Sequence, residues 1–127
     1  MIVNVRLGFE TISEEYFNSL LACTKLPHFM GILGGKPRKA FYFVGAHYKS
    51  QQLVFLDPHI VHKHIPNINT ENKHQYISNK NKFHSIESSA RMIHLSKLDP
   101  CMSIAYLIKS REDFLDFKRR LSKIMQP

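Results

Sequence analysis

The chain has 127 residues, 43% of them hydrophobic and 22% charged, which is the size and composition of one globular domain able to bury its own core. An excess of 18 Lys and Arg over 10 Asp and Glu gives a formal net charge of +8, which leaves a nucleic acid, an acidic lipid surface or an acidic protein open as a partner. Two Cys, and no apolar run near the roughly 20 residues that span a bilayer, exclude a disulfide scaffold and a membrane helix, and the composition also excludes collagen and a coiled coil.

The first predicted elements are a strand and a helix. Apolar residues at period two predict a half-buried strand over residues 2–9. Ser13 stands where a helix N-cap belongs, with two glutamates in the first turn, and Pro27 follows the expected end of the helix. The face with helical spacing consists of Phe17, Leu20, Leu21 and Thr24.

The middle of the chain predicts a loop and two strands. Residues 31–35 read Gly-Ile-Leu-Gly-Gly and lead into a basic stretch, so we expect a glycine-rich loop there. Aromatic and branched residues predict strands over 40–45 and 52–56. The polar residues 47–51 between them predict a hairpin connection, which makes the two strands antiparallel neighbours.

The last part of the chain begins with a polar insert. Asn, Lys and Ser dominate from residue 67 to about 90, which predicts a long polar loop. A buried strand is predicted over 102–108, followed by a helix that Ser110 caps, with Asp113 three residues on. The apolar stripe of that helix consists of Phe114, Phe117, Leu121 and Ile124. Several strands with a helix near each end indicate an α+β fold, with a mostly antiparallel sheet and flanking helices.

The segment Leu56-Asp57-Pro58-His59 carries the most informative polar pair. Two residues that are two apart on an extended chain project to the same side, so Asp57 and His59 have the spacing of an acid that orients a general base. The same residues also fit a simple turn, in which Asp57 bonds the backbone and His59 is solvated. The spacing alone favours the turn.

A metal site and a phosphate loop are disfavoured by the spacing. His59, His62 and His64 lie close together, but a structural zinc site takes four ligands and neither Cys is near. Only three residues separate Gly31 from Gly35, and a proline follows the next lysine, so the phosphate-loop pattern is not met. We therefore expect no metal and no cofactor.

The cysteines and the basic residues suggest no chemistry of their own. Cys23 lies near the end of a predicted helix and Cys101 opens a strand, whereas a nucleophilic thiol is typically activated at a helix N-terminus. Both suit a reducing compartment, and the first residues lack a signal-peptide pattern, so we expect a cytoplasmic protein. The Lys and Arg residues are scattered without a nucleic-acid motif, which favours a solvated surface over nucleic-acid binding.

Three blocks carry a family resemblance. Residues 31–37 read Gly-Ile-Leu-Gly-Gly-Lys-Pro, residues 40–45 read Ala-Phe-Tyr-Phe-Val-Gly, and residues 53–59 read Leu-Val-Phe-Leu-Asp-Pro-His. In this order and spacing they closely resemble the C-terminal half of the autophagins, autophagy cysteine endopeptidases with a papain-like fold. The likeness extends back to residues 6–9 and forward to the last helix. It implies that the whole chain is the C-terminal part of such a peptidase domain, with the polar insert added.

The resemblance implies a substrate and assigns roles. Autophagins cleave after a glycine near the C-terminus of a ubiquitin-like autophagy modifier, maturing its precursor and releasing it from phosphatidylethanolamine. Asp57 and His59 fall on the acid and base of the catalytic triad, and Arg6 and Phe9 fall in a segment that contacts the modifier. The residues that fall on the loop gating the cleft are Gly34, Gly35, Lys36, Pro37, Arg38 and Lys39.

One departure from the family pattern is decisive for activity. The nucleophile of autophagins lies in a Gly-Trp-Gly-Cys context, and this sequence contains no Trp. The resemblance therefore implies a cysteine protease of which this chain holds the acid and the base but not the thiol, so that the chain alone is inactive. Two alternatives stay open: a non-catalytic module that binds the modifier, and a basic nucleic-acid-binding protein.

Overall fold

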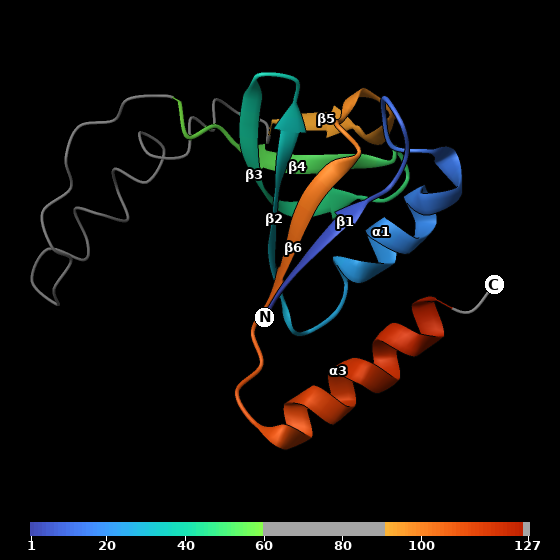
Figure 1. The fold of residues 1–127 in the computed structure, drawn as a ribbon, viewed down its shortest axis with the longest axis vertical. Helices are drawn as coiled ribbons and strands as arrows, with labels where there is room; N and C mark the ends of the chain where they lie inside the picture. Colours follow the sequence, from blue (N-terminus) through green and yellow to red (C-terminus); the bar gives the residue numbers. More distant parts are fainter. Residues whose placement is uncertain (60–90, 126–127) are drawn as a thin grey trace, which may run out of the picture.

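A computed structural model describes residues 1–59 and 91–125 (Figure 1). Its centre is a six-stranded sheet in the order β1-β6-β2-β3-β4-β5, in which every pair of neighbours is antiparallel. The strands are β1 (Ile2–Arg6), β2 (Phe29–Lys36), β3 (Lys39–His47), β4 (Gln52–Leu56), β5 (Met92–His94) and β6 (Cys101–Tyr106). The predicted α+β class is confirmed, whereas the predicted insert at 67–90 lies outside the described residues.

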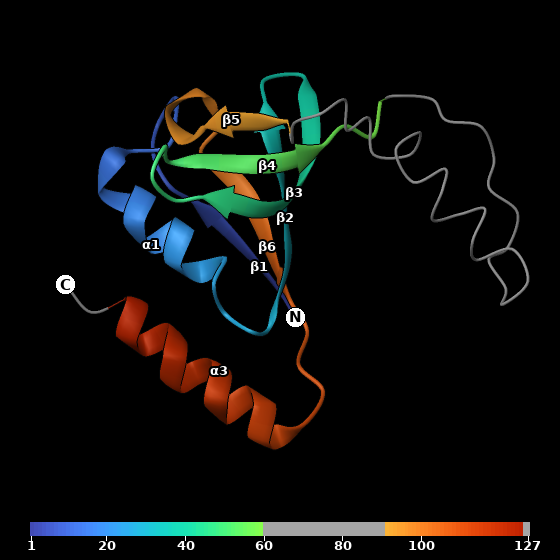
Figure 2. The same cartoon turned by 180° about the vertical axis from the view of Figure 1, so that it is seen from behind.

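The helices lie on one face of this sheet. Helix α1 (Phe17–Cys23) follows a 3₁₀ turn (Glu14–Tyr16), and a second 3₁₀ turn (Leu95–Lys97) precedes β6. Helix α3 (Arg111–Ile124) comes last, and in both views it runs alongside α1 (Figures 1 and 2). None of the described helices has the length and apolar character needed to cross a bilayer.

Two predictions at the N-terminus were wrong in detail. The strand predicted over 2–9 ends at Arg6. The Leu7 N–H still donates to the Pro100 carbonyl, but Pro100 has no N–H to return, and the Leu7 carbonyl accepts from the backbone N–H of Ser13. Ser13 does occupy the N-cap position, that of the 3₁₀ turn before α1, but its side chain makes no capping hydrogen bond; its backbone N–H donates to Leu7 and its carbonyl accepts from Tyr16. The chain between β1 and α1 is therefore held by backbone contacts to strand ends instead of a cap.

The glycine-rich stretch 31–35 is a strand and not the predicted loop. At each end of this stretch, at Gly31 and at Gly35, a group of β3 lies so close that a side chain would not fit. A Cβ on Gly31 would lie 2.4 Å from the Tyr42 ring, and one on Gly35 would lie 2.0 Å from the Lys39 carbonyl oxygen. Both glycines also have positive φ, 149° and 158° respectively, which L side chains rarely adopt. The glycines thus serve close packing of β2 against β3.

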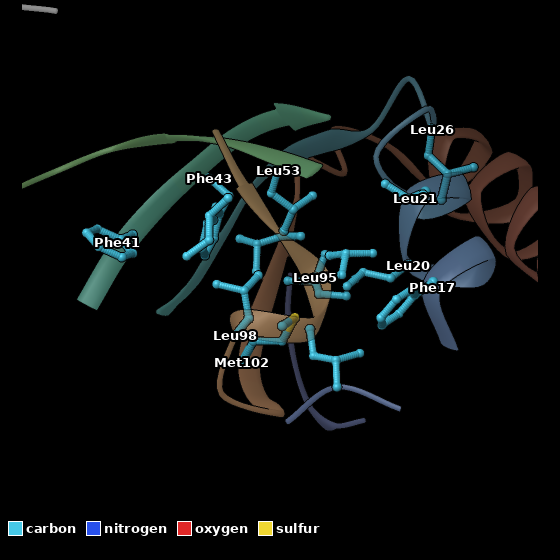
Figure 3. Close-up of a cluster of buried hydrophobic side chains, with 14 of the residues drawn as sticks. Phe17, Leu20, Leu21, Leu26, Phe41, Phe43, Leu53, Leu95, Leu98 and Met102 are labelled. Carbon is cyan, nitrogen blue, oxygen red and sulfur yellow. The ribbon is translucent and has the colours of Figure 1, made fainter. Parts of the chain in front are cut away.

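The core lies between the sheet and α1. Ile32 of β2 pairs with Phe43 of β3 on one side and with Ile104 of β6 on the other, and both Ile32 and Phe43 are fully buried. Burial of each such side chain is worth about 1.5–3 kcal/mol, so this row anchors the centre of the sheet. Figure 3 shows Phe17, Leu20 and Leu21 of α1 together with side chains from the sheet and the chain after β5: Phe41, Phe43, Leu53, Leu95, Leu98 and Met102.

Helix α3 begins at the predicted cap, but fewer of its apolar side chains are buried than the predicted stripe implied. The Ser110 hydroxyl accepts from the backbone N–H of Asp113, which is the expected N-cap bond. Phe117 is buried against Tyr106, with ring centroids 4.6 Å apart, whereas Phe114 of the predicted apolar stripe is 45% exposed. A cavity of about 400 Å³ remains between the sheet, α1 and α3, and its lining includes Val3, Val5, Leu20, Cys23, Tyr106 and Leu121.

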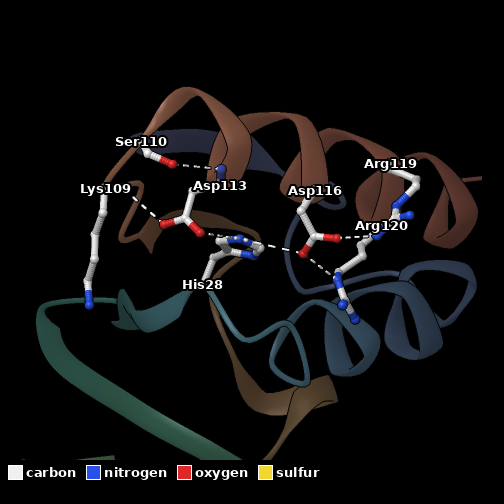
Figure 4. A network of polar contacts seen from close by, with 7 residues as sticks. All are labelled: His28, Lys109, Ser110, Asp113, Asp116, Arg119 and Arg120. Carbon is white, nitrogen blue, oxygen red and sulfur yellow. Dashed lines mark hydrogen bonds and ion pairs between the residues drawn. The ribbon is translucent and has the colours of Figure 1, made fainter.

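A buried histidine joins α3 to the chain between α1 and β2. His28 is 6% exposed, and its Nε2 atom lies 3.8 Å from a carboxylate oxygen of Asp113 and 3.8 Å from one of Asp116 (Figure 4). Asp116 is also held by the guanidinium groups of Arg119 and Arg120. The His28 ring packs edge-on against Phe117, so one side chain links the polar and apolar contacts of the helix.

We expect Gly35→Ala to destabilise the fold by about 1–3 kcal/mol, because the new Cβ meets the Lys39 carbonyl and the backbone is held at positive φ. Urea unfolding followed by circular dichroism measures the loss. Gly45→Ala is the matched control in the neighbouring strand, since no atom lies within 4 Å of its added Cβ, and it should change stability by less than about 0.5 kcal/mol. Equal losses in the two variants would contradict the close-packing explanation.

Candidate active site

The predicted acid and base leave the sheet at the end of β4. This strand lies between β3 and β5, and its second residue, Leu53, is fully buried. Leu56, its last residue, pairs with Tyr42 of β3, and Pro58 follows without an N–H to continue the ladder. The strand prediction over 52–56 is confirmed, and the chain therefore turns at a fixed point to present Asp57 and His59.

Asp57 and His59 contact each other directly. One carboxylate oxygen, Oδ1 of Asp57, accepts from the backbone N–H of His59 at 3.0 Å and contacts the ring nitrogen Nδ1 of His59 at 2.7 Å. The turn and the acid–base pair weighed against each other in the sequence are thus both present in one arrangement. The Asp57 side chain is 6% exposed and the His59 side chain 52% exposed, so the acid is enclosed and the imidazole faces outward.

The charge state of Asp57 determines which nitrogen of His59 carries the proton. The hydrogen bonds from the backbone and ring of His59, together with Lys39, hold the pKa of Asp57 down at about 2. Asp57 is then ionised at neutral pH and can only accept, so Nδ1 of His59 must be the donor. This tautomer leaves the lone pair of Nε2 available, which is the arrangement that a general base requires.

The second oxygen of Asp57 has a partner that sequence reasoning did not assign to it. Oδ2 lies 3.1 Å from Nζ of Lys39, which was expected in a gating loop. The two residues are far apart in the sequence and meet only through the register of β3 on β4. No local motif signals such a contact, so it could not be found without the fold.

The predicted gating loop is a tight β-hairpin. Gly34, Gly35 and Lys36 belong to β2, Lys39 begins β3, and Lys36 pairs with Lys39. Only Pro37 and Arg38 remain in the turn, and Arg38 has a φ of 66°. Proline first and positive φ second are features of a type II turn. The segment therefore ends in a stiff tip, in contrast to the flexible loop that the glycines suggested.

The predicted contact residues Arg6 and Phe9 form a preorganised pair. The Arg6 guanidinium donates to the carbonyls of Gly8 and Phe9 at 3.1 and 3.3 Å and lies 5.8 Å from the centroid of the Phe9 ring. Phe9 is 83% exposed, which is unusual for an aromatic side chain. The antiparallel order places the end of β1, the β2–β3 hairpin and the end of β4 at one end of the sheet, so these residues share that end with Asp57.

Comparison with known proteins decides the family. A family model described as "Peptidase C54 catalytic domain" matches residues 1–120. The chain belongs to the peptidase C54 family. The resemblance to a papain-like cysteine protease is thereby confirmed, and the α+β domain with its antiparallel sheet is part of that fold.

The curated relatives that this C54 chain matches are longer proteins. It is 34% identical over 126 residues to "Probable cysteine protease atg4" of Aspergillus clavatus, which covers 95% of this chain and 29% of that protein. It is 31% identical to "Cysteine protease ATG4B" of Xenopus laevis, over 98% of this chain and 30% of that protein, and 33% identical to "Cysteine protease ATG4A" of Homo sapiens, over 90% and 27%. The chain therefore spans about three-tenths of the length of these relatives.

The two cysteines of this C54 chain lie away from the acid–base pair. Cys23 ends α1 and is buried, and this burial raises the pKa of its thiol, as expected for a packing residue. Cys101 is exposed at the start of β6, which is separated from β4 by β2 and β3, about 14 Å along the sheet at the usual strand spacing. His62 and His64 of the disfavoured metal cluster lie outside the described residues.

The low pKa of Asp57 predicts how stability depends on pH. Because this pKa lies near 2, below its ordinary 3.8, the ionised carboxylate stabilises the fold above about pH 4, and that contribution is lost as the pH falls through about 2. Denaturant unfolding of the wild type and Asp57→Asn across this range should give two curves that converge as the pH falls. Curves that stay parallel over the same range would contradict the assigned charge state.

Proposed function

We propose that this chain supplies the acid and the base of a C54 cysteine endopeptidase that acts on a ubiquitin-like autophagy modifier. Cleavage would follow the C-terminal glycine of the modifier, both in its precursor and in its phosphatidylethanolamine conjugate. The observation that carries the proposal is the Asp57–His59 contact of 2.7 Å at the end of β4, with an enclosed acid and an outward-facing imidazole. The nucleophilic thiol comes from residues other than these 127.

The chemistry proposed for the pair is ordinary thiol proteolysis. Nε2 of His59 takes the proton of the incoming thiol, and the thiolate attacks the glycyl carbonyl carbon to form a tetrahedral adduct. The adduct collapses to a thioester while the imidazolium returns the proton to the leaving amine, and water then hydrolyses the thioester with His59 again as the base. Asp57 remains ionised and stabilises the imidazolium through Nδ1.

The residues around the pair are proposed to select and admit the modifier. The hairpin tip at Pro37 and Arg38 is the gate. Because its turn has only two residues, the tip would move together with the paired strands, which would pivot near Gly35. Arg6 and Phe9 form the contact surface on the other side of the same sheet end. Action in the cytoplasm fits two cysteines that are both free.

The net charge of +8 gives less support to nucleic-acid binding than its size suggests. Arg119 and Arg120 are paired with Asp116, and Lys39 is paired with Asp57, so several basic side chains already serve internal contacts. Binding to RNA or DNA that weakens steeply with salt would favour that alternative over the protease.

A reconstitution assay tests the proteolytic role. The chain alone should not cleave a fluorescent modifier precursor or release its lipid conjugate. Joined to the thiol-bearing remainder of the Aspergillus clavatus relative, it should cleave both, and His59→Ala should lower kcat by at least about 10³-fold. Asp57→Asn should lower kcat strongly as well, since it loses the tautomer control.

A matched control and a contrary outcome complete that experiment. His94→Ala changes a histidine whose ring nitrogen is bonded to Ser96, and it should leave kcat within about twofold, because His94 pairs with Gln52 at the opposite end of β4 from Asp57. Turnover by the isolated chain, or full activity of the His59→Ala chimera, would refute the assignment of base and missing thiol.

A second candidate function, modifier binding without catalysis, is favoured by the exposure of Phe9. An 83% exposed ring held under a guanidinium is a ready anchor for a partner pocket. Phe9→Ala should weaken binding of the modifier to the isolated chain by about 5- to 150-fold in isothermal titration calorimetry, which corresponds to 1–3 kcal/mol for an anchor residue. Phe114→Ala, an exposed aromatic on α3, is the control and should leave affinity unchanged. No measurable binding by the wild-type chain would exclude this candidate.

A further inference from the structure

We propose that Lys39 is a positioning residue for the acid–base pair: it holds one carboxylate oxygen of Asp57 so that the other stays on His59. The inference rests on the proposed roles of Asp57 and His59 and adds a third member that neither the predicted roles nor the family comparison assigns. Lys39 does not touch the reacting atoms, and its effect passes through Asp57.

The need for a third group follows from the enclosure of Asp57. Its side chain is 6% exposed, and an ionised carboxylate with little contact to water is held in one orientation when donors lie against both of its oxygens. Both donors to Oδ1, the backbone N–H and the ring, come from His59. Among the described residues, the contact to Oδ2 is Nζ of Lys39 at 3.1 Å. Lys39 therefore supplies the contact to Oδ2, the oxygen of Asp57 that His59 does not bind.

The fold fixes where Lys39 stands. Lys36 pairs with Lys39 across the two-residue turn, and the absence of a side chain at Gly35 lets the Lys39 carbonyl approach closely. Because β3 pairs with β4 through Tyr42 and Leu56, its first residue extends past the end of β4, over the point where Asp57 leaves the sheet. The position of the ammonium group is thus set by backbone pairing as well as by charge.

The Lys39 side chain can make this contact at little cost. Its ammonium lies 5.5 Å from the centroid of the Phe41 ring, a cation–π distance, and 52% of the side chain stays in water. A partly hydrated ammonium keeps solvent for its remaining protons, so pairing with Asp57 does not require full desolvation. The contact orients the carboxylate without burying a second charge.

The arrangement also couples the hairpin to the acid. Lys39 belongs to the ribbon proposed as the gate, and lifting that ribbon draws Nζ away from Oδ2. Asp57 then loses its second anchor and can rotate about its terminal bond, which weakens the control over the His59 tautomer. Through this one ion pair, the position of the hairpin affects the orientation of Asp57 and therefore the tautomer of His59.

The His59 tautomer ratio tests the proposal in this chain directly, without substrate or thiol. Long-range ¹H–¹⁵N NMR at neutral pH measures the Nδ1–H to Nε2–H ratio, with the His59 signal assigned by its loss in His59→Ala. Lys39→Met keeps the stem over Phe41 and removes the charge, and it should lower the ratio roughly two- to fivefold, the effect of losing one partly exposed ion pair. Lys39→Arg restores a cation and should keep the ratio near that of the wild type.

Lys36→Met is the matched control, because Lys36 faces Lys39 across the same turn and makes no ion pair with Asp57 in the described structure. It should leave the ratio unchanged. An unchanged or raised ratio in Lys39→Met, an equal fall in Lys36→Met, or a fall in Lys39→Arg as large as in Lys39→Met would each overturn the proposal. Amide spectra of the hairpin confirm that the comparison is made between folded proteins.

The outcome is separable from that of the proposed function. If the tautomer ratio does not change in Lys39→Met, the positioning role of Lys39 is refuted, and the result of the cleavage assay with the chimera still stands. A chimera that fails to cleave, with the tautomer ratio responding as expected, would contradict the protease proposal and leave the Lys39–Asp57–His59 arrangement in place.

Discussion

The site depends on one steric constraint, the close approach of the β2 backbone to β3 at Gly35. A side chain there would collide with the Lys39 carbonyl, so only glycine permits so tight a ribbon. The tight ribbon sets the register of β3 on β2, and β3 in turn pairs Tyr42 with Leu56, the last residue of β4 before Pro58 interrupts the ladder. The pairing of the backbone thus places the acid, the base and the neighbouring ammonium close to one another.

Ion pairs then fix the orientation of two acidic side chains, Asp57 and Asp116. In a chain of net charge +8, two carboxylates collect cationic side chains: Asp57 pairs with Lys39, and Asp116 pairs with Arg119 and Arg120. The first contact orders the site and the second lies beside His28, where α3 meets the body of the domain (Figure 4). The Asp57 contact joins the start of β3 to the end of β4, whereas the arginine contacts of Asp116 lie within α3 and hold that acid beside His28.

The sequence predicted those features whose causes are local. The run of apolar residues before Asp57 marked β4, and the Ser110 cap marked the start of α3. The spacing of Asp57 and His59 fitted both a turn and an acid–base pair and favoured the turn with a solvated His59, whereas in the structure both contacts are present. It failed where the cause lies on another strand: the space at Gly35 is filled by the opposite backbone, and Lys39 reaches Asp57 only across a sheet register. Such causes leave no mark in the residues nearby.

The contrast between the two cysteines has a practical consequence for studying this chain. Cys23 is buried with a raised thiol pKa, whereas Cys101 is exposed and pairs across the β1–β6 ladder with Arg6. Since thiol-reactive dyes attack accessible thiolates, a maleimide fluorophore would attach selectively at Cys101 in the native protein without any engineered cysteine. The dye would then sit beside the surface of Arg6 and Phe9, and its emission would report the arrival of any molecule at that end of the sheet.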